Sequence, residues 1–312
     1  MTDLPKNDIY LPEGLRTALP PDLSALREAQ NNGTILEAAV LRCGTDRSLQ
    51  VSLRGMTGII PHDEALAPWI SGAGRDISLL TCVGNPVCFH VNEISADAKG
   101  APRILLSRRS AQEQAKAYFL QHYTPGSVVL SRVTHLEPFG AFLDIGCGVI
   151  ALLPIENISV SRIRHPGERL RVGQKLLTVV ANADPSVPRF TMTLKELLGT
   201  WLENAAQFCP GETVPGIVRA VKEYGCFVEL APNLSGLADL REDVAEGDRV
   251  SVFIKSIRPE RMKIKLQIIR RLPPERAVRP LHPFITDGEL TRWVYSPPGC
   301  EKPVMETAFT SL

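Results

Sequence analysis

The sequence predicts an all-β protein built from tandem small β-barrels, and two observations lead to this prediction. The phrase Phe-Gly-Ala-Phe-Leu-Asp-Ile-Gly at residues 139–146 returns 85 positions later as Tyr-Gly-Cys-Phe-Val-Glu-Leu at residues 224–230. A repeat made of short strands and turns is typical of small barrels rather than of one large sheet. The 312 residues also include 25 Pro and 23 Gly but only 6% aromatic residues, which favours many turns and small cores.

Alternation within the repeated phrase predicts which face of each barrel carries aromatic rings. Successive strand residues point to opposite faces, so Phe142 shares a face with Asp144, and Phe227 shares one with Glu229. An ionised carboxylate seldom lies in an apolar core without a partner. We therefore expect Phe142 and Phe227 on the solvent-facing side of their barrels.

These rings predict a surface for nucleic acid. Phe139 precedes Phe142 in the turn before the strand, and Tyr224 precedes Phe227 in the same way. Every nucleobase has a flat face, and its stacking on an aromatic ring contributes about 1–3 kcal/mol. The alternative interpretation is that the rings close the ends of the barrels as part of the core.

The chain resembles the ribosomal S1 RNA-binding family, in the short form found in Gram-positive bacteria. Three phrases carry the resemblance: Phe-Gly-Ala-Phe at 139–142, Arg-Ile-Leu-Leu-Ser-Arg-Arg at 103–109, and the stretch 250–266 that begins Val-Ser-Val-Phe-Ile-Lys. The resemblance covers roughly residues 30 to 270 as three repeats. It implies three tandem S1-type OB-fold β-barrels, each five-stranded, joined by short helical linkers.

Pro-rich segments and helical periodicity divide the chain further. Helical spacing after Ser110 and around Trp201 predicts two linkers. Asp-Gly at 287–288 predicts a hairpin that Trp293 and Tyr295 pack onto the third barrel, although these rings are also candidates for extra RNA platforms. The expected segments are a flexible N-terminal arm (1–30), a degenerate first barrel (31–109), a helical linker (110–123), a second barrel (124–193), a second helical linker (194–210), a third barrel (211–271) and a Pro-rich tail with the hairpin (272–312).

The first repeat differs from the other two in the residues of its second strand. This strand, at residues 49–53, places Gln50 and Ser52 on the face where the later repeats carry Phe142 and Phe227. We therefore expect the first barrel to contact a protein, such as a small ribosomal subunit protein, rather than to stack bases.

In the second repeat the resemblance implies a binding site of two aromatics, a histidine, and an acidic-basic pair on neighbouring strands. The position of the histidine is occupied by Pro154. The turn at residues 161–171, beside the aromatic strand, is rich in arginine. We expect this cationic turn to compensate for the missing histidine through contacts with phosphates and bases. The alternative interpretation is an ordinary solvated turn. The candidate RNA-binding residues of this repeat are Phe139, Phe142, Arg162, Arg164, His165, Arg169, Asp184 and Arg189.

In the third repeat the resemblance implies a more cationic site. The histidine position is occupied by Asp239, which repels phosphate. Arg258 and Lys263 occupy the positions of the acidic-basic pair, so both members are basic in this repeat. Lys263 and Lys265 are expected to face outward while Ile264 and Leu266 pack inward. The candidate RNA-binding residues of this repeat are Tyr224, Phe227, Arg258, Arg261, Lys263 and Lys265.

Composition excludes several functional classes. The formal net charge is +1, so RNA binding has to come from local cationic clusters. No apolar run is long enough to cross a bilayer, the N-terminus lacks the apolar core of a signal peptide, and seven single cysteines are typical of reduced thiols in a cytosol. Cys82, Cys88 and His90 suggest zinc, but without a second ligand pair small buried thiols are the better interpretation. We expect a cytoplasmic protein without metal or cofactor.

These observations lead to a ranked set of functions. The leading hypothesis is non-enzymatic binding of single-stranded RNA, specifically mRNA, by a monomer associated with the small ribosomal subunit in translation. The alternatives are a protein-interaction scaffold with vestigial RNA binding, and an RNA-binding regulator that acts off the ribosome. An enzyme is not expected, because the chain contains no Gly-rich phosphate loop, no paired metal-binding carboxylates and no nucleophile-base pairing.

Overall fold

The computed structural model describes residues 10–16, 19–69, 74–96, 100–183, 190–274 and 280–309. Its strands form three closed barrels of five strands each. In every barrel the fifth strand inserts between the third and fourth, and it pairs parallel to the third. This strand order is that of the partly open Greek-key barrel called the OB fold. The prediction of an all-β chain with three tandem OB-fold barrels is therefore confirmed.

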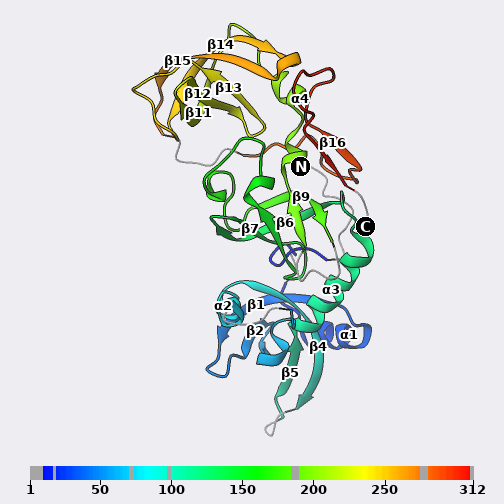
Figure 1. Cartoon of the computed structure of the whole chain (residues 1–312). Coiled ribbons are helices and arrows are strands. Elements are labelled where there is room, and N and C mark those ends of the chain that lie inside the picture. The colour runs from blue at the N-terminus through cyan, green and yellow to red at the C-terminus, as the bar shows by residue number, and fades with distance from the viewer. Residues whose placement is uncertain are drawn as a thin grey trace.

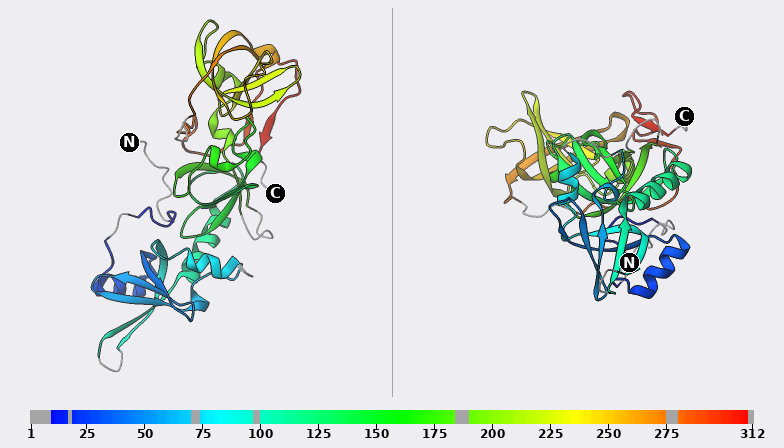
Figure 2. Two further views of the ribbon diagram at one scale, coloured as in Figure 1. Left: turned by 90° about the vertical axis from the view of Figure 1, so that its left-hand side faces the viewer. Right: turned by 90° about the horizontal axis from the view of Figure 1, so that it is seen from below.

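The three barrels follow one another along the long axis of the molecule. The first is blue to cyan, the second green and the third yellow to orange (Figure 1), and the same order is visible after a quarter turn (Figure 2). A long helix, α3 (Arg108–His122), runs from the first barrel along the second. Within the described ranges, none of the helices combines the length and the apolar character needed to cross a bilayer.

The first barrel is closed around a core of its own. Leu49, Val51, Ile60 and Phe89 are fully buried in it, and helix α1 covers it with the fully buried Leu26. Its elements are α1 (Leu23–Asn32), β1 (Leu36–Cys43), β2 (Leu49–Leu53), β3 (Met56–Ile60), η1 (His62–Glu64), α2 (Gly74–Leu80), β4 (Pro86–Ala96) and β5 (Pro102–Ser107).

The second barrel shares one continuous core with α3 and with the third barrel. Phe119 of α3 is fully buried and meets Phe190 edge-on, with ring centroids 6.4 Å apart. The sequence predicts a helix that starts at Ser110, whereas α3 starts two residues earlier, at Arg108. The side chain of Ser107 caps this end of the helix by accepting from the Ser110 N–H. The remaining elements are β6 (Val128–Glu137), β7 (Gly140–Asp144), β8 (Ile150–Pro154), η2 (Ile155–Asn157), η3 (Pro166–Glu168), β9 (Lys175–Asn182), β10 (Thr191–Thr193), η4 (Lys195–Leu198) and α4 (Trp201–Ala205).

The third barrel shows the clearest alternation of faces. In β15, Lys263 and Lys265 are exposed while Ile264 and Leu266 are buried, as the sequence predicts. The elements of this barrel and of the tail are β11 (Thr213–Lys222), β12 (Gly225–Ala231), β13 (Leu234–Ala238), β14 (Arg249–Arg258), η5 (Pro259–Arg261), β15 (Lys263–Arg271), β16 (Arg292–Val294) and β17 (Glu306–Ala308).

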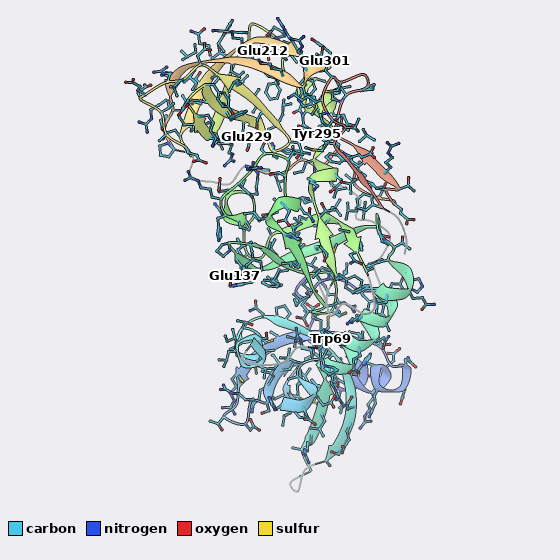
Figure 3. The ribbon with its side chains drawn as sticks, in the orientation of Figure 1. Trp69, Glu137, Glu212, Glu229, Tyr295 and Glu301 are labelled. Atoms are coloured by element: carbon cyan, nitrogen blue, oxygen red, sulfur yellow. The ribbon has the colours of Figure 1, made fainter. Side chains whose placement is uncertain are left out.

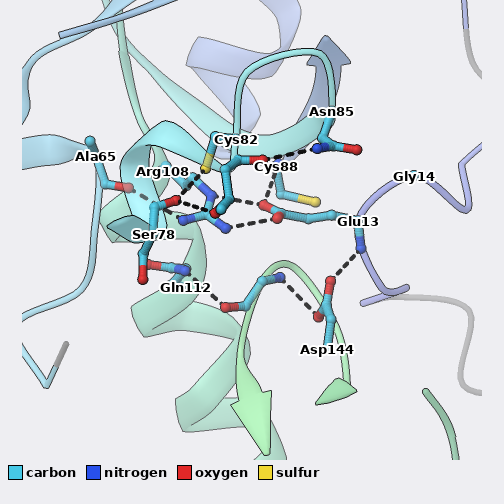
Figure 4. A network of polar contacts seen from close by, with 12 residues as sticks. Glu13, Gly14, Ala65, Ser78, Cys82, Asn85, Cys88, Arg108, Gln112 and Asp144 are labelled. Carbon is cyan, nitrogen blue, oxygen red and sulfur yellow. Dashed lines mark hydrogen bonds and ion pairs between the residues drawn. The ribbon is translucent and has the colours of Figure 1, made fainter. Parts of the chain in front are cut away.

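Residues 10–16 lie between the first and second barrels, which corrects the prediction of a flexible arm for this part of the chain. The Glu13 carboxylate forms an ion pair with Arg108 at 2.7 Å and accepts from the Cys88 N–H at 3.0 Å. The Glu13 N–H donates to Asp144 at 2.7 Å (Figure 4). These polar contacts hold residues 10–16 in place between the two barrels.

Asp144 is buried in this network, and its ionisation depends on its surroundings. Burial, together with the neighbouring Glu13 carboxylate, raises the pKa of Asp144 to about 7, against the opposing effect of the backbone N–H groups of Glu13 and Gly146. The same carboxyl in an unfolded chain has a pKa of about 3.9. Between these two values the folded state binds more protons than the unfolded state, so this contribution to stability is present at low pH and is lost as the pH rises.

We expect the free energy of unfolding to fall by up to about 1.4 kcal/mol per pH unit through this group, between about pH 4 and about pH 7. Urea denaturation of the wild type and of Asp144→Asn over that range measures the difference, which should shrink in the variant because its amide does not titrate. Asp239→Asn, at an exposed ion pair with Lys255, is the control and should keep the wild-type slope. Equal slopes for the wild type and Asp144→Asn would contradict the prediction.

The tail contains a hairpin, but its turn is not where the sequence predicts it. Strands β16 and β17 pair antiparallel, so the connection runs through residues 295–305. Gly288 instead accepts from the Val128 N–H at 3.0 Å, which joins the Asp-Gly segment to the second barrel. Tyr295 packs the hairpin onto the third barrel as expected, since its hydroxyl donates to the Asn233 carbonyl.

Candidate nucleic-acid interface

The second and third barrels each carry an aromatic pair with the same geometry. The rings of Phe139 and Phe142 meet edge to face, with centroids 6.0 Å apart and planes at 88°. Those of Tyr224 and Phe227 are 6.1 Å apart at 89°. The first ring of each pair is largely exposed, at 55% for Phe139 and 69% for Tyr224, and the second is half-buried.

The glycine within each phrase is explained by a close approach of two strands. A Cβ on Gly140 would lie 2.5 Å from the backbone oxygen of Leu153, and one on Gly225 would lie 2.3 Å from that of Ala238. Gly225 also has a φ of +142°, which L side chains rarely adopt. A residue without a side chain is therefore needed between the two rings, which leaves the rings on either side of a tight turn.

Phe142 and Phe227 lie on the outward face of their barrels, as the sequence predicts. The carboxylates on the same face were expected to be solvated, but they are buried. Asp144 is 2% exposed and Glu229 is 5% exposed. Each has partners from an earlier part of the chain: Glu13 at Asp144, and Arg169 at Glu229. On the outward face of each strand, the aromatic ring is therefore partly open to solvent, whereas the carboxylate is covered. The N-terminal segment around Glu13 covers Asp144, and the second-barrel turn that contains Arg169 covers Glu229.

His135 lies beside the second-barrel pair and was not recognised in the sequence. It is the cross-strand partner of Phe142, and the two rings lie at 27° with centroids 6.4 Å apart. Its Nε2 is 2.7 Å from a Glu137 carboxylate oxygen. A bulge between Val133 and His135 shifts the register, so simple alternation does not place this ring. The third barrel has Ala220 at the corresponding position, opposite Phe227.

Strand register places cations close to the third-barrel pair. Phe227 is paired with Leu237 on β13, and Leu237 with Lys265 on β15. Two strand spacings amount to about 10 Å, which a lysine side chain partly bridges. The other predicted cations are also exposed: Arg258 is the cross-strand partner of Lys263, while Arg261 pairs with Glu301 of the tail at 3.1 Å. Asp239 pairs with Lys255 at 3.4 Å, so its charge is partly balanced.

The cationic turn of the second repeat docks on the third barrel, which corrects the prediction for Arg169. Arg169 is 5% exposed and forms an ion pair with Glu229, so RNA has no access to it while the barrels are docked. Arg164 pairs with Glu246, and the His165 ring caps η3 by accepting from the Gly167 N–H at 3.0 Å. Arg162 is exposed. Two arginines of the turn, Arg164 and Arg169, thus pair with acidic residues of the next barrel.

Asp184 and Arg189 lie outside the described residues. Pro154 is the cross-strand partner of Gly140, beside the aromatic turn. In the first barrel Gln50 accepts from the Nε of Arg42 at 2.8 Å, at the position that corresponds to the ring of Phe142. This strand face therefore presents a polar pair in place of an aromatic one.

Known proteins resemble the chain in sequence and, more weakly, in structure. The family model described as "S1 RNA binding domain" matches residues 123–194. Small ribosomal subunit protein bS1 of Staphylococcus aureus is 29% identical over 271 residues, which cover 82% of this chain and 66% of that protein. The bS1 protein of Staphylococcus haemolyticus is 29% identical over 269 residues, with 81% and 66% covered. The chain thus spans slightly less than two thirds of the length of these relatives.

Among solved structures, a multidomain protein with nucleic acid binding domains from Streptococcus pneumoniae is 16% identical to this chain. The match covers 76% of this chain and 73% of that one, with a TM-score of 0.26.

Proposed function

The chain belongs to the ribosomal protein S1 family, and from this premise we propose that it binds single-stranded RNA on the aromatic pairs of its second and third barrels. The RNA is messenger RNA, the setting is the small ribosomal subunit in the cytoplasm, and no reaction is catalysed. The domain boundaries predicted above, with the second barrel at 124–193 and the third at 211–271, are part of the proposal.

One observation carries this proposal: the same edge-to-face aromatic pair recurs on corresponding strands of two barrels. Phe139 and Tyr224 are the more exposed residues, and the ring of each lies next to a second ring. Each base that stacks on such a ring gains about 1–3 kcal/mol whatever its identity, because every base has a π-face. Stacking needs an unpaired base, so the proposal specifies single strands and weak sequence preference.

The cations around the third-barrel pair supply the second part of the binding energy. Lys265 is exposed two strand spacings from Phe227, and Lys263 and its cross-strand partner Arg258 are exposed near it on β15 and β14. Each phosphate contact on a single strand makes log K fall by about 0.7 more for every tenfold increase in salt concentration. Binding that weakens with salt and shows little base preference is the signature we expect.

The direct test compares the full chain on one unstructured RNA and on the same RNA annealed to its complement. We expect at least about tenfold tighter binding to the single strand, since the duplex hides the base faces. Fluorescence anisotropy at two salt concentrations measures both affinities. Equal affinity for both forms would contradict the proposal. Sedimentation of cell extract on a gradient separates a subunit-bound protein from a regulator that stays with free transcripts.

A second candidate function concerns the first barrel, where a protein contact is favoured over RNA. Ile77, Leu80 and Val83 are exposed apolar side chains on α2 and the turn that follows it. Exposed apolar clusters of this kind mark protein contacts. This supports a small ribosomal subunit protein as the partner of the first barrel, with the other two barrels left to hold RNA.

A further inference from the structure

His135 of β6 has an exposed ring that lies beside the aromatic pair of the second barrel. Its ring is nearly parallel to that of Phe142, at 27° and with centroids 6.4 Å apart, whereas Phe139 meets Phe142 edge-on. Phe142 is thus the common neighbour of two rings, one from the adjacent strand and one from the turn before its own strand. Three neighbouring rings therefore lie on the outward side of the second barrel.

A bulge brings the ring of His135 to this face of the barrel. The register of β6 against β7 shifts just before His135, which is paired with Phe142. The third barrel has the same shift just before Ala220, which is paired with Phe227. Cross-strand partners point to the same face of a sheet, so each bulge sets one side chain beside the half-buried ring. The second barrel has an aromatic ring at this position, and the third has a methyl group.

The residue two positions further along the strand differs together with this one. Glu137 is paired with Gly140 in the second barrel and is labelled at the edge of that barrel in Figure 3. Lys222 is paired with Gly225 in the third. The Glu137 carboxylate lies 2.7 Å from Nε2 of His135. A carboxylate accepts a hydrogen bond, so it keeps a proton on Nε2 and holds the ring in one orientation. The ring and the carboxylate that orients it occur in the second barrel, and neither occurs at these positions of the third.

Stability does not account for this pair. The side chains of His135 and Glu137 are 62% and 39% exposed, and exposed ion pairs contribute little to the free energy of unfolding. A ring that is already held in place loses less conformational freedom when a ligand binds. An oriented ring next to two others suits a ligand with flat faces, and nucleobases are such ligands.

We propose that His135 is a third base-binding ring of the second barrel and that Glu137 positions it. The inference rests on the proposed function and deepens it, because it makes the two RNA-binding barrels unequal. The second barrel offers its RNA strand a wider aromatic surface and depends more on stacking. The third barrel has Ala220 and the cation of Lys222 at these positions, and depends more on contacts with phosphates.

The first experiment measures the affinity of the full chain and of variants at residue 135 for single-stranded RNA. His135→Ala should weaken binding at least about fivefold, because it removes a stacking ring. His135→Gln stays polar without a ring and should lose as much, whereas His135→Phe keeps a ring and should stay within about threefold of the wild type. All three changes are at an exposed side chain, which limits their effect on folding.

The matched control is His122→Ala, which removes another exposed histidine, one that stacks on Tyr118 of α3. It should keep the wild-type affinity. Wild-type affinity in His135→Ala would overturn the proposal, and so would equal losses in His135→Gln and His135→Phe, because the ring would then not be what binds.

The second experiment tests contact with the base and the role of Glu137. RNA that contains 4-thiouridine is crosslinked to the full chain by ultraviolet light, and mass spectrometry locates the crosslinked residues. We expect crosslinks at His135 as well as at Phe142. Glu137→Ala and Glu137→Gln remove the same charge, but the amide oxygen of glutamine still accepts from the imidazole. The share of crosslinks at His135 should therefore fall in Glu137→Ala and persist in Glu137→Gln, with those at Tyr224 unchanged in both.

The outcomes separate this inference from the proposed function. Crosslinks at Phe142 without any at His135 would overturn the third ring, and equal shares at His135 in the two Glu137 variants would overturn the positioning role. Binding that is weakened by Phe142→Ala but not by His135→Ala leaves the aromatic pairs in place without the third ring. Absence of RNA binding by the wild type overturns both the inference and the proposed function.

Discussion

Replacing Glu229 with alanine is expected to destabilise the protein by about 3–5 kcal/mol. Glu229 is 5% exposed and holds both Arg169 and Arg219, whose side chains are 6% and 9% exposed. Removing the carboxylate leaves two buried guanidinium groups without their common partner, and an uncompensated buried charge is far more costly than a lost surface pair. Urea denaturation of the full chain measures the change as a shift of the unfolding transition.

A second acidic residue of the same interface is the control for this prediction. Glu246 pairs with Arg164, but the side chains of the pair are 39% and 67% exposed. Exposed pairs contribute about 0–1 kcal/mol, so Glu246→Ala should hardly move the transition. Similar losses of unfolding free energy for the two variants would contradict the prediction that the buried network of Glu229, Arg169 and Arg219 stabilises the protein more than the exposed pair does. Joint replacement of Glu229, Arg169 and Arg219 by apolar residues should recover much of the loss, because both buried guanidinium groups are removed with their carboxylate and only the partly exposed Glu168 loses a partner.

The largest effect on RNA binding is expected from the two half-buried rings. Phe142→Ala and Phe227→Ala should each weaken binding about 5- to 150-fold, because each removes one stacked base at about 1–3 kcal/mol. The double variant should lose roughly the product of the two effects, since the rings lie on different barrels. Fluorescence anisotropy with a single-stranded oligonucleotide long enough to reach both barrels gives the affinities.

Two further variants make this prediction specific to stacking. Phe142→Trp keeps an aromatic face and should retain binding within a few fold, about 1 kcal/mol or less. Tyr118→Ala removes a half-buried ring that stacks on His122 of α3, and it should leave the affinity unchanged. Wild-type affinity in both Phe→Ala variants would instead favour the scaffold interpretation, in which the barrels serve protein contacts.

The sequence predicted correctly those features that depend on residues close together along the chain. The alternation of Lys263, Ile264, Lys265 and Leu266 was enough to assign their faces, because neighbouring strand residues always point to opposite sides. The aromatic pair and its glycine recur as one phrase, so the turn they form was recognisable without knowledge of the rest of the barrel.

Predictions were wrong where the outcome depended on a distant segment. Arg169 looked like a free cation, but its partner Glu229 lies 60 residues away in another barrel. Glu13 looked like part of a loose arm, but Arg108 is 95 residues away. His135 was missed because a bulge changes the register, and the hairpin turn was misplaced because residues 288–290 pair with the second barrel.

By itself, then, the sequence determined the fold class, the three repeats and the solvent-facing direction of Phe142 and Phe227. Only the tertiary structure decided which charged residues are covered at the junctions and which remain for a ligand. The physical reason is how far apart along the chain the interacting residues lie. Strand alternation and turn chemistry act between neighbouring residues, and the barrel motif carries both in its own sequence. The burial of a charge depends on what packs against it, and at Asp144 and Glu229 that is an earlier unit of the chain.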